Sequence, residues 1–240
     1  MGDSIQYSFQ RYEVKYFLTP EQAAQLVRGI APYTRPDAYG RYTIRSIYYD
    51  TPDWRLIRAS LAKPDYKEKL RVRSYGTCPP DGQVFVELKK KCAGIVYKRR
   101  ITAAVQDAEP FLQGDIAPAH YGQIGQEIAW FQTRYHAEPK VLLSYDRAAF
   151  AGTQDAALRM TLDQNIRWRT DALDLRQNGG EQPLLDTDAV LLEIKLPGVC
   201  PLWLSRLLSE LGARPASFSK YGAWYRAQVR KQNREGIYCA

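Results

Sequence analysis

The stretch YKEKLRVRSYG, residues 66–76, has the pattern of a β-strand that carries only cations on one of its faces. The basic residues occupy alternate positions: Lys67, Lys69, Arg71 and Arg73. The hydrophobic residues Leu70 and Val72 lie between them. Successive side chains of a strand point to opposite faces of the sheet, so the four cations share one side. A face of this kind needs either solvent or an anionic partner.

Strand patterns recur along the chain, with turn residues and helical patterns between them. Further strands are expected at QRYEVKYFL (10–18), GRYTIRSIYYD (40–50), QVFVELKKK (83–91), GIVYKRRIT (94–102), KVLLSYDRAAF (140–150), ALRMTLDQNIRWR (157–169) and AVLLEIKLPG (189–198). Helices are expected at TPEQAAQLVRGIA (19–31), TPDWRLIRAS (51–60), residues 107–136, PLWLSRLLSELG (201–212) and residues 219–234. Thr19, Pro20 and Gln22 predict a capping box at the first helix. About eight strands with helices between them indicate an α+β fold around an antiparallel sheet.

The composition narrows the class of protein. The chain has 240 residues, 45% of them hydrophobic, which suffices for one core, so we expect a single domain over residues 1–240. There are 34 Lys and Arg against 26 Asp and Glu, and the net charge of +8 suggests a polyanionic partner. Four scattered cysteines, no signal-peptide pattern and no apolar run of about 18 residues favour a cytoplasmic protein.

The charged strand faces favour a closed barrel, although periodicity alone also allows a sandwich with a solvated face. Hydrophobic residues such as Val86 and Leu192 would pack outward against the helices. The charged residues would then point inward, where about eight strands leave room for one small ligand. Because buried cations need partners, that ligand would be an anion. Glutamates among the cations, such as Glu193, further suggest Mg²⁺ or Mn²⁺ held by carboxylate and phosphate oxygens.

Nine fragments carry a family resemblance. In chain order, between residues 11 and 222, they are RYEVKY, IYYDTPDW, KLRVRSYG, VFVELKKK, VYKRR, YDRAAF, LRMTLD, LLEIKL and SFSKYG. Together they resemble the VTC domain family of the triphosphate tunnel metalloenzyme (CYTH-like) superfamily. The resemblance implies an eight-stranded antiparallel β tunnel barrel with helices packed outside. It also implies a polyphosphate polymerase that transfers the γ-phosphate of ATP to inorganic polyphosphate with Mn²⁺ or Mg²⁺.

The resemblance also implies which residues act. The residues expected to bind phosphate and carry catalysis are Lys15, Arg71, Arg73, Lys89, Lys98, Arg147, Arg159, Ser219 and Lys220. Glu193 matches the metal-binding glutamate of the family. Ser217 stands where the polymerases have a lysine, which puts one phosphate contact in doubt. Export of polymer in the family makes a membrane-protein partner plausible.

Two other functions stay open. The related tunnel triphosphatases act on inorganic triphosphate or nucleoside triphosphates and carry an E-x-E-x-K first strand. This chain has Arg11 at the first glutamate position, and the exchange favours a phosphate nucleophile over activated water. The third candidate function is a non-catalytic polyphosphate-binding subunit of a membrane complex. Nucleic-acid binding is disfavoured, because the cations lie in strands mixed with glutamates rather than in a tail or recognition helix.

Some residues have no functional assignment from the sequence. Arg99 and Arg100 are as consistent with surface charges as with ligands. Trp54, Trp203 and Trp224 lie in expected helices, where tryptophans usually belong to the core. The sequence therefore indicates no site for an adenine base.

Overall fold

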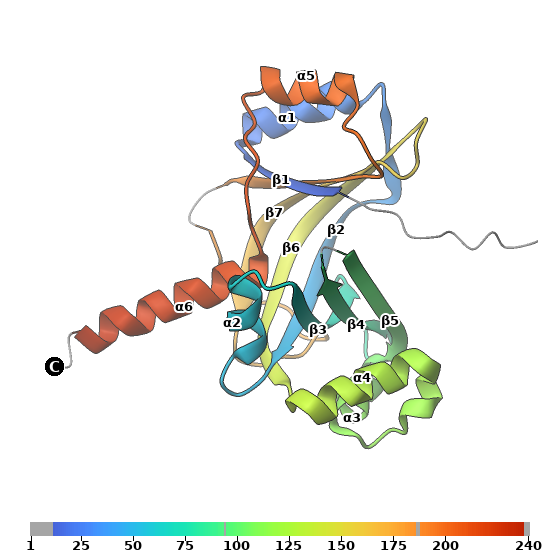
Figure 1. Ribbon diagram of the computed structural model, residues 1–240, viewed down its shortest axis with the longest axis vertical. Coiled ribbons are helices and arrows are strands. Elements are labelled where there is room, and N and C mark those ends of the chain that lie inside the picture. The colour runs from blue at the N-terminus through green and yellow to red at the C-terminus, as the bar shows by residue number, and fades with distance from the viewer. Residues whose placement is uncertain (1–11, 94, 186–187, 238–240) are drawn as a thin grey trace, which may run out of the picture. The chain divides into compact units, whose positions relative to one another are not determined.

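The computed structural model describes residues 12–93, 95–185 and 188–237 (Figure 1). The chain forms two compact units. Unit 1 comprises Met1–Tyr42, Asp146–Asn165 and Leu185–Phe218, and unit 2 comprises Thr43–Tyr145, Ile166–Leu184 and Ser219–Ala240. Arg11, where the sequence departs from the tunnel triphosphatases, lies outside the described residues.

The described strands form one sheet. They are β1 (Tyr12–Leu18), β2 (Thr34–Asp50), β3 (Tyr66–Tyr75), β4 (Gln83–Cys92), β5 (Ile95–Ala104), β6 (Glu138–Gly152), β7 (Arg159–Arg169), β8 (Gln182–Pro183) and β9 (Val190–Leu196). Their hydrogen-bonded order is β1-β9-β7-β6-β2-β3-β4-β5, with β8 beside β7. Pairs β1–β9, β7–β9, β2–β3, β3–β4 and β4–β5 are antiparallel, as predicted. Nine strands are described rather than eight, because the two-residue β8 adds one.

The described strands do not close into the predicted barrel, since β1 and β5 end the hydrogen-bonded order. The edge of β1 that faces away from β9 is already paired with another segment. Tyr16 forms a bridge with Pro215. The Ala216 N–H donates to the carbonyl oxygen of Lys15 at 2.7 Å. This segment therefore takes the position that a closing strand would need.

The described helices lie in the expected parts of the chain, although the helical region expected at residues 107–136 is divided into three helices. They are α1 (Pro20–Ile30), α2 (Arg55–Leu61), α3 (Val105–Gln113), the 3₁₀ helix η1 (Pro118–Tyr121), α4 (Gly122–Tyr135), α5 (Leu202–Glu210) and α6 (Lys220–Ile237). The predicted capping box is confirmed at α1: Thr19 Oγ1 accepts from the Gln22 N–H at 3.2 Å, and Gln22 Oε1 accepts from the Thr19 N–H at 2.8 Å. None of the described helices is long and apolar enough to cross a membrane.

The start of α2 was predicted wrongly. The Thr-Pro pair at Thr51 suggested a helix from there, but α2 begins at Arg55. The preceding Asp50 is fully buried and supplies the cap: its carboxylate accepts from the N–H groups of Leu56 (2.8 Å) and Ile57 (2.9 Å). Thr51 Oγ1 accepts from the Arg55 N–H at 2.8 Å. Two side chains thus satisfy the first turn, and the helix starts where their oxygens reach.

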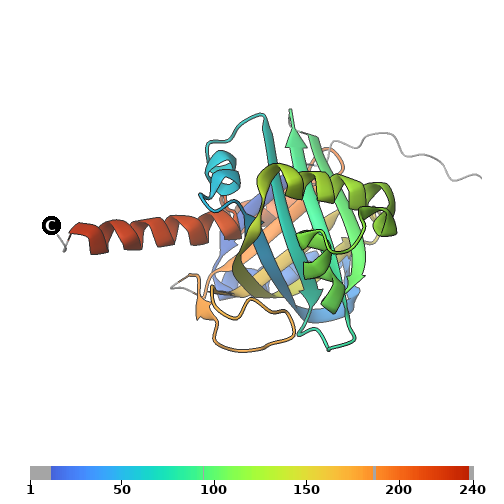
Figure 2. The same cartoon turned by 90° about the horizontal axis from the view of Figure 1, so that it is seen from below.

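Each unit has a hydrophobic core between its strands and helices. In unit 1, α1 and α5 lie together (Figure 1) and cover the apolar residues of β9, such as Leu192 and Ile194. In unit 2, α3 and α4 cover the apolar residues of β3 and β4, such as Leu70 and Val86 (Figure 2). The apolar strand face therefore meets helices in both units, as expected. Most charged residues of these strands lie on the opposite face. Glu68 and Lys90 are exceptions in unit 2: they pair in the register on the helix-covered face, and Lys90 Nζ lies 3.7 Å from Glu127 of α4.

Candidate functional site

Unit 2 carries a charged surface on β3, β4 and β5, on the strand face opposite α3 and α4. Strand register aligns Lys69 with Lys89 and Lys98 in one row, and Arg71 with Glu87 and Arg100 in the next. We call this surface the basic face. Its members are Lys67, Lys69, Arg71, Arg73, Glu87, Lys89, Lys98 and Arg100. Four sequence-predicted phosphate ligands, Arg71, Arg73, Lys89 and Lys98, thus share one face.

Glu87 is the common partner of the cations on the basic face. Its side chain is 1% exposed. Glu87 Oε2 accepts from Arg71 Nε at 2.7 Å, and Oε1 lies 2.7 Å from Lys98 Nζ. Glu87 Oε1 also accepts from Arg100, with Nε at 2.7 Å, and Arg73 Nε lies 4.0 Å from Oε2. One carboxylate therefore holds four cations from β3 and β5 in place.

The charges around Glu87 do not balance. Burial would raise the pKa of the Glu87 carboxyl, but Arg71, Arg73 and Lys98 outweigh burial and hold that pKa well below its usual range. Glu87 therefore stays ionised at neutral pH. Four cations around one carboxylate leave a surplus of positive charge on a partly buried surface. Such a surplus favours a polyanionic ligand, whose oxygens the arginines can bind in bidentate fashion.

Hydroxyl groups complete the contacts of the two arginines. Tyr48 OH accepts from Arg71 Nη1 at 3.0 Å. Arg73 donates to Ser46 Oγ (3.1 Å) and to Tyr145 OH (3.2 Å). Burial would raise the pKa of the Tyr48 hydroxyl, but Arg71 and Arg73 outweigh it and lower the pKa to about 8. Tyr48 is therefore a group on this face that titrates just above neutral pH.

The start of α6 brings Ser219 and Lys220 to the same part of unit 2. Lys69 Nζ lies 3.3 Å from Ser219 Oγ, and Lys220 Nζ lies 4.1 Å from the centre of the Tyr145 ring. The next residue, Tyr221, stacks on Tyr48 and donates its hydroxyl to Asp50 at 2.9 Å. The buried Asp50 thus fixes the first turn of α6 as well as that of α2.

Unit 1 carries a second charged cluster, on β1, β9 and β7. Lys15 lies opposite Glu193 in the strand register, and its Nζ is 3.6 Å from Glu193 Oε2 and 3.0 Å from Glu13 Oε1. Lys15 Nζ also donates to the Phe218 carbonyl oxygen at 3.0 Å. Lys195 Nζ lies 3.1 Å from Glu193 Oε1. The predicted metal ligand therefore contacts two lysines.

The two predicted arginines of unit 1 have different surroundings. Arg147 makes a bidentate pair with the fully buried Asp163, at 2.6 Å from Nε and 2.8 Å from Nη2. Arg159 is exposed and aligns with Lys195 on β9. Arg147 is thus oriented by a buried carboxylate, in the way that Glu87 orients the arginines of unit 2.

A divalent cation fits these residues only in company with phosphate. Within the described ranges, no group of three or more His, Cys, Asp or Glu side chains could hold a metal ion. Glu193 and Glu13 offer carboxylates on adjacent strands, each near Lys15. Mg²⁺ is commonly bound by one or two carboxylates together with substrate phosphates. This donor set suits that mode of binding.

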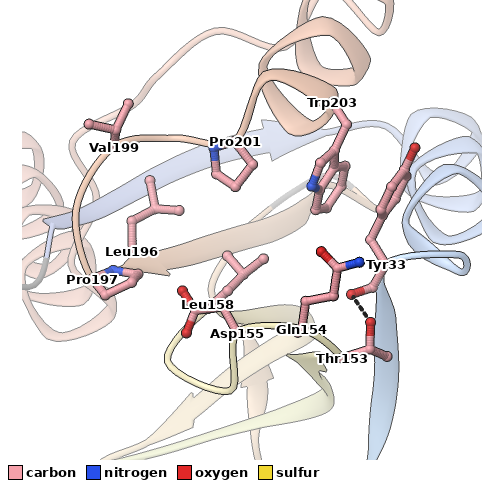
Figure 3. Close-up of a pocket in the computed structure, with 11 residues that line it drawn as sticks. Tyr33, Thr153, Gln154, Asp155, Leu158, Leu196, Pro197, Val199, Pro201 and Trp203 are labelled. Carbon is pink, nitrogen blue, oxygen red and sulfur yellow. Dashed lines mark hydrogen bonds between the residues drawn. The ribbon is translucent and has the colours of Figure 1, made fainter.

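Unit 1 also has a pocket of about 240 Å³ (Figure 3). Tyr33 and Trp203 stack at its wall, with ring centroids 4.1 Å apart. Thr153 Oγ1 donates to the Tyr33 carbonyl oxygen at 3.1 Å. Among the described residues, its lining includes none of the sequence-predicted site residues. The pocket is therefore not the predicted phosphate site.

Five residues that organise these clusters have no role predicted from the sequence: Ser46, Tyr48, Glu87, Tyr145 and Asp163. The position of Glu87 could have been predicted, because it lies two residues before Lys89 on the same strand and therefore points to the same face. The same parity argument places Arg100 with Lys98 on the basic face. Asp163 and Tyr145 gave no comparable signal, because their partners lie on other strands.

Comparison with known proteins identifies the family. A family model described as the VTC domain matches residues 10–228. The chain belongs to the VTC domain family. A VTC domain relative, vacuolar transporter chaperone complex subunit 4 of Trypanosoma brucei brucei, is 25% identical over 268 residues, which cover 89% of this chain. The subunit 4 of Schizosaccharomyces pombe is 25% identical over 281 residues, covering 92% of this chain. The match spans only 34% and 38% of these two relatives, so this VTC chain corresponds to about a third of each.

A solved structure agrees on the fold. An adenylyl cyclase from Hippeastrum, described as having a dominant triphosphatase activity, superposes with a TM-score of 0.52 at 15% sequence identity. The match covers 90% of this VTC chain and 95% of the cyclase. At this identity the similarity shows the fold alone.

Proposed function

We propose that this VTC domain is a phosphotransferase that extends inorganic polyphosphate with the γ-phosphate of ATP. The observation that carries the proposal is the basic face, where four cations surround the single buried carboxylate of Glu87. A surplus of fixed cations suits a linear phosphate chain, which repeats its charge along its length. The names of the two relatives, subunits of a vacuolar transporter chaperone complex, are consistent with this class of function.

The proposed mechanism depends on positioning and charge. Arg71 and Arg73 would bind phosphate oxygens as planar forks, and Lys69, Lys89 and Lys98 would act as point charges along the chain. Phosphoryl transfer asks a protein mainly to position the reactants and to stabilise developing charge. The attacking terminal phosphate is already an anion, so no general base is required. His120 and His136 accordingly lie in η1 and after α4, not on the basic face.

Further residues are assigned by the same reasoning. Ser219 would donate its hydroxyl to a phosphate oxygen, and Lys220 would add a positive charge close to Arg73 through their shared contact with Tyr145. In unit 1 we assign phosphate binding to Lys15, Arg147 and Arg159. Glu193 would hold a divalent ion, Mn²⁺ or Mg²⁺, which when bound neutralises charge on phosphate oxygens. A cytoplasmic location and a membrane-protein partner for export stay predictions.

The test is a polymerisation assay. Purified protein is incubated with ATP and Mn²⁺; polyphosphate is then resolved on a gel and orthophosphate is measured. We expect polymer from the wild-type protein and at least a hundredfold less from Arg71→Ala, because that change removes a bidentate phosphate contact. Arg99→Ala is the matched control: Arg99 lies on the same strand as Lys98 but pairs with Glu127, and activity should persist.

The other outcomes identify the competing functions. Orthophosphate without polymer would make the protein a triphosphatase, and the proposed transfer to polyphosphate would be wrong. Binding of polyphosphate without turnover of ATP would make it a binding subunit. Added salt should weaken the binding of polyphosphate whether or not the protein turns over ATP, because the contacts are ionic.

A further inference from the structure

We propose that Tyr75, Phe85 and Arg100 form a binding site for the purine base of the donor nucleotide. The inference rests on the proposed function, because it takes ATP as the phosphate donor. It assigns a role to one end of the basic face that phosphate binding leaves unexplained. All three residues belong to unit 2 and lie on adjacent strands.

The strand register places the three side chains together. Tyr75 ends β3 and has the same parity as Arg71 and Arg73, so it points to the basic face. Phe85 on β4 lies opposite Arg73 and also faces that side. The Tyr75 and Phe85 rings meet edge to face, with centroids 5.7 Å apart at 77°. The Arg100 guanidinium lies 4.4 Å from the centre of the Phe85 ring.

These planar groups are accessible. Tyr75 is 49% exposed, and the Arg100 side chain is 33% exposed. Phe85 is only half-buried, although it lies in the middle of three paired strands. Nucleic-acid bases stack on aromatic rings and on guanidinium planes, and such stacking tolerates different bases. An exposed tyrosine beside an arginine-capped phenylalanine offers both kinds of surface.

The position of this aromatic end fits a nucleotide rather than a free base. Arg100 also donates to Glu87, which holds Arg71 and Lys98. Phe85 and Glu87 are two residues apart on one strand, which corresponds to about 7 Å. A ribose can bridge a separation of this order. A base stacked at Tyr75 would therefore direct its phosphates along Arg73, Arg71 and then the lysines.

The opposite end of the basic face differs in kind. Lys67 aligns with Lys91, and Lys69 aligns with Lys89. Burial lowers the pKa of Lys67, and the neighbouring Lys91, Lys89 and Lys63 lower it further. Lysine charges without aromatic rings suit a polymer that has no base. The asymmetry would bind the nucleotide in one orientation, with its terminal phosphate toward the lysine end.

The test compares ATP with inorganic tripolyphosphate, which has the phosphates but no base. Binding of each to wild-type protein and to Tyr75→Ala is measured by titration calorimetry in Mg²⁺ buffer. In Tyr75→Ala we expect the affinity for ATP to fall about tenfold, which is the usual effect of removing one aromatic ring that stacks on a base. The affinity for tripolyphosphate should change less than about twofold. Phe85→Leu retains a hydrophobic side chain and should give the same selective loss. Tyr97→Ala is the control, since Tyr97 is similarly exposed but has the opposite parity on β5.

The outcomes separate this site from the proposed function. Equal loss of both ligands, or no loss of either in both variants, would overturn the base site. A selective loss of ATP in a protein that makes no polymer would leave the base site standing and the polymerase proposal wrong. If the protein makes polymer but the variants lose affinity for ATP and tripolyphosphate equally, the polymerase proposal would stand and the base site would be wrong.

Discussion

Glu87 is the residue on which the geometry of the basic face depends. We expect Glu87→Gln to lower the free energy of unfolding by about 3 kcal/mol, because removing one partner of a buried ion pair leaves the others uncompensated. Urea unfolding followed by circular dichroism measures the loss. Glu127→Gln is the matched control: Glu127 pairs with Arg99 and Lys90 but is more exposed, so its loss should be small.

The same variant also tests ligand binding. Phosphate oxygens can supply the negative charge that Glu87→Gln removes, so tripolyphosphate should raise the melting temperature of the variant more than that of the wild type. An equal or smaller rise would show that the cations do not reach the phosphate.

Titration of the Tyr48 hydroxyl should make phosphate binding depend on pH. Its pKa is about 8, and a bound polyanion beside Arg71 would raise that pKa because it disfavours the tyrosinate. Binding above pH 8 therefore requires proton uptake, and tripolyphosphate affinity should fall by up to about tenfold per pH unit. Tyr48→Phe should bind with nearly constant affinity between pH 7 and 9, as measured by calorimetry. A fall of equal size in Tyr48→Phe would assign the dependence to another group.

At the scale of single residues, the sequence predicted the positions of the basic side chains better than those of the carboxylates that pair with them. Alternation alone placed Arg71 and Arg73 on one face, because parity is a local property of a strand. The pairing of Arg147 with Asp163 depends on how β6 and β7 approach each other, which no local pattern specifies. Sequence patterns therefore indicated the cations that we propose to bind phosphate, but not the carboxylates that orient them.

At the scale of the elements, Asp50 connects three of them in unit 2. It ends β2, caps α2 and accepts the Tyr221 hydroxyl of α6. We expect Tyr221→Phe to lower the free energy of unfolding by about 1 kcal/mol, the usual contribution of one hydrogen bond. Asp50→Ala should cost about 3 kcal/mol or more, since several buried donors lose their acceptor. Urea unfolding of both variants compares the two losses. Equal costs would mean that the α2 cap contributes nothing.

The misplaced start of α2 has the same origin. Thr-Pro is a common helix start, and it predicted α1 correctly at Thr19. At Thr51 the buried carboxylate of the preceding residue competes and moves the first turn to Arg55. Burial of Asp50 depends on the tertiary structure, so the sequence pattern alone could not rank the two capping groups.

At the scale of the whole molecule, composition and the order of fragments predicted the family and the antiparallel sheet. They did not predict the pairing of β1 with Pro215, because a single bridge leaves no periodic signal. They also did not predict two compact units. Strands β2, β6 and β7 nevertheless contribute residues to both units.

Shared strands predict a single cooperative unfolding transition. Unfolding one unit would break strands that carry the core residues of the other, as β6 carries Leu142 in unit 2 and Phe150 in unit 1. The tryptophans offer separate probes, since Trp203 is in unit 1 and the other four are in unit 2. In Trp203→Phe, tryptophan fluorescence reports on unit 2 alone, while circular dichroism reports on the whole chain. We expect the two urea transitions to coincide, which is the mark of two-state unfolding. A circular dichroism transition that begins before the fluorescence changes would mean that unit 1 unfolds independently, and the expectation of one domain over residues 1–240 would then be wrong.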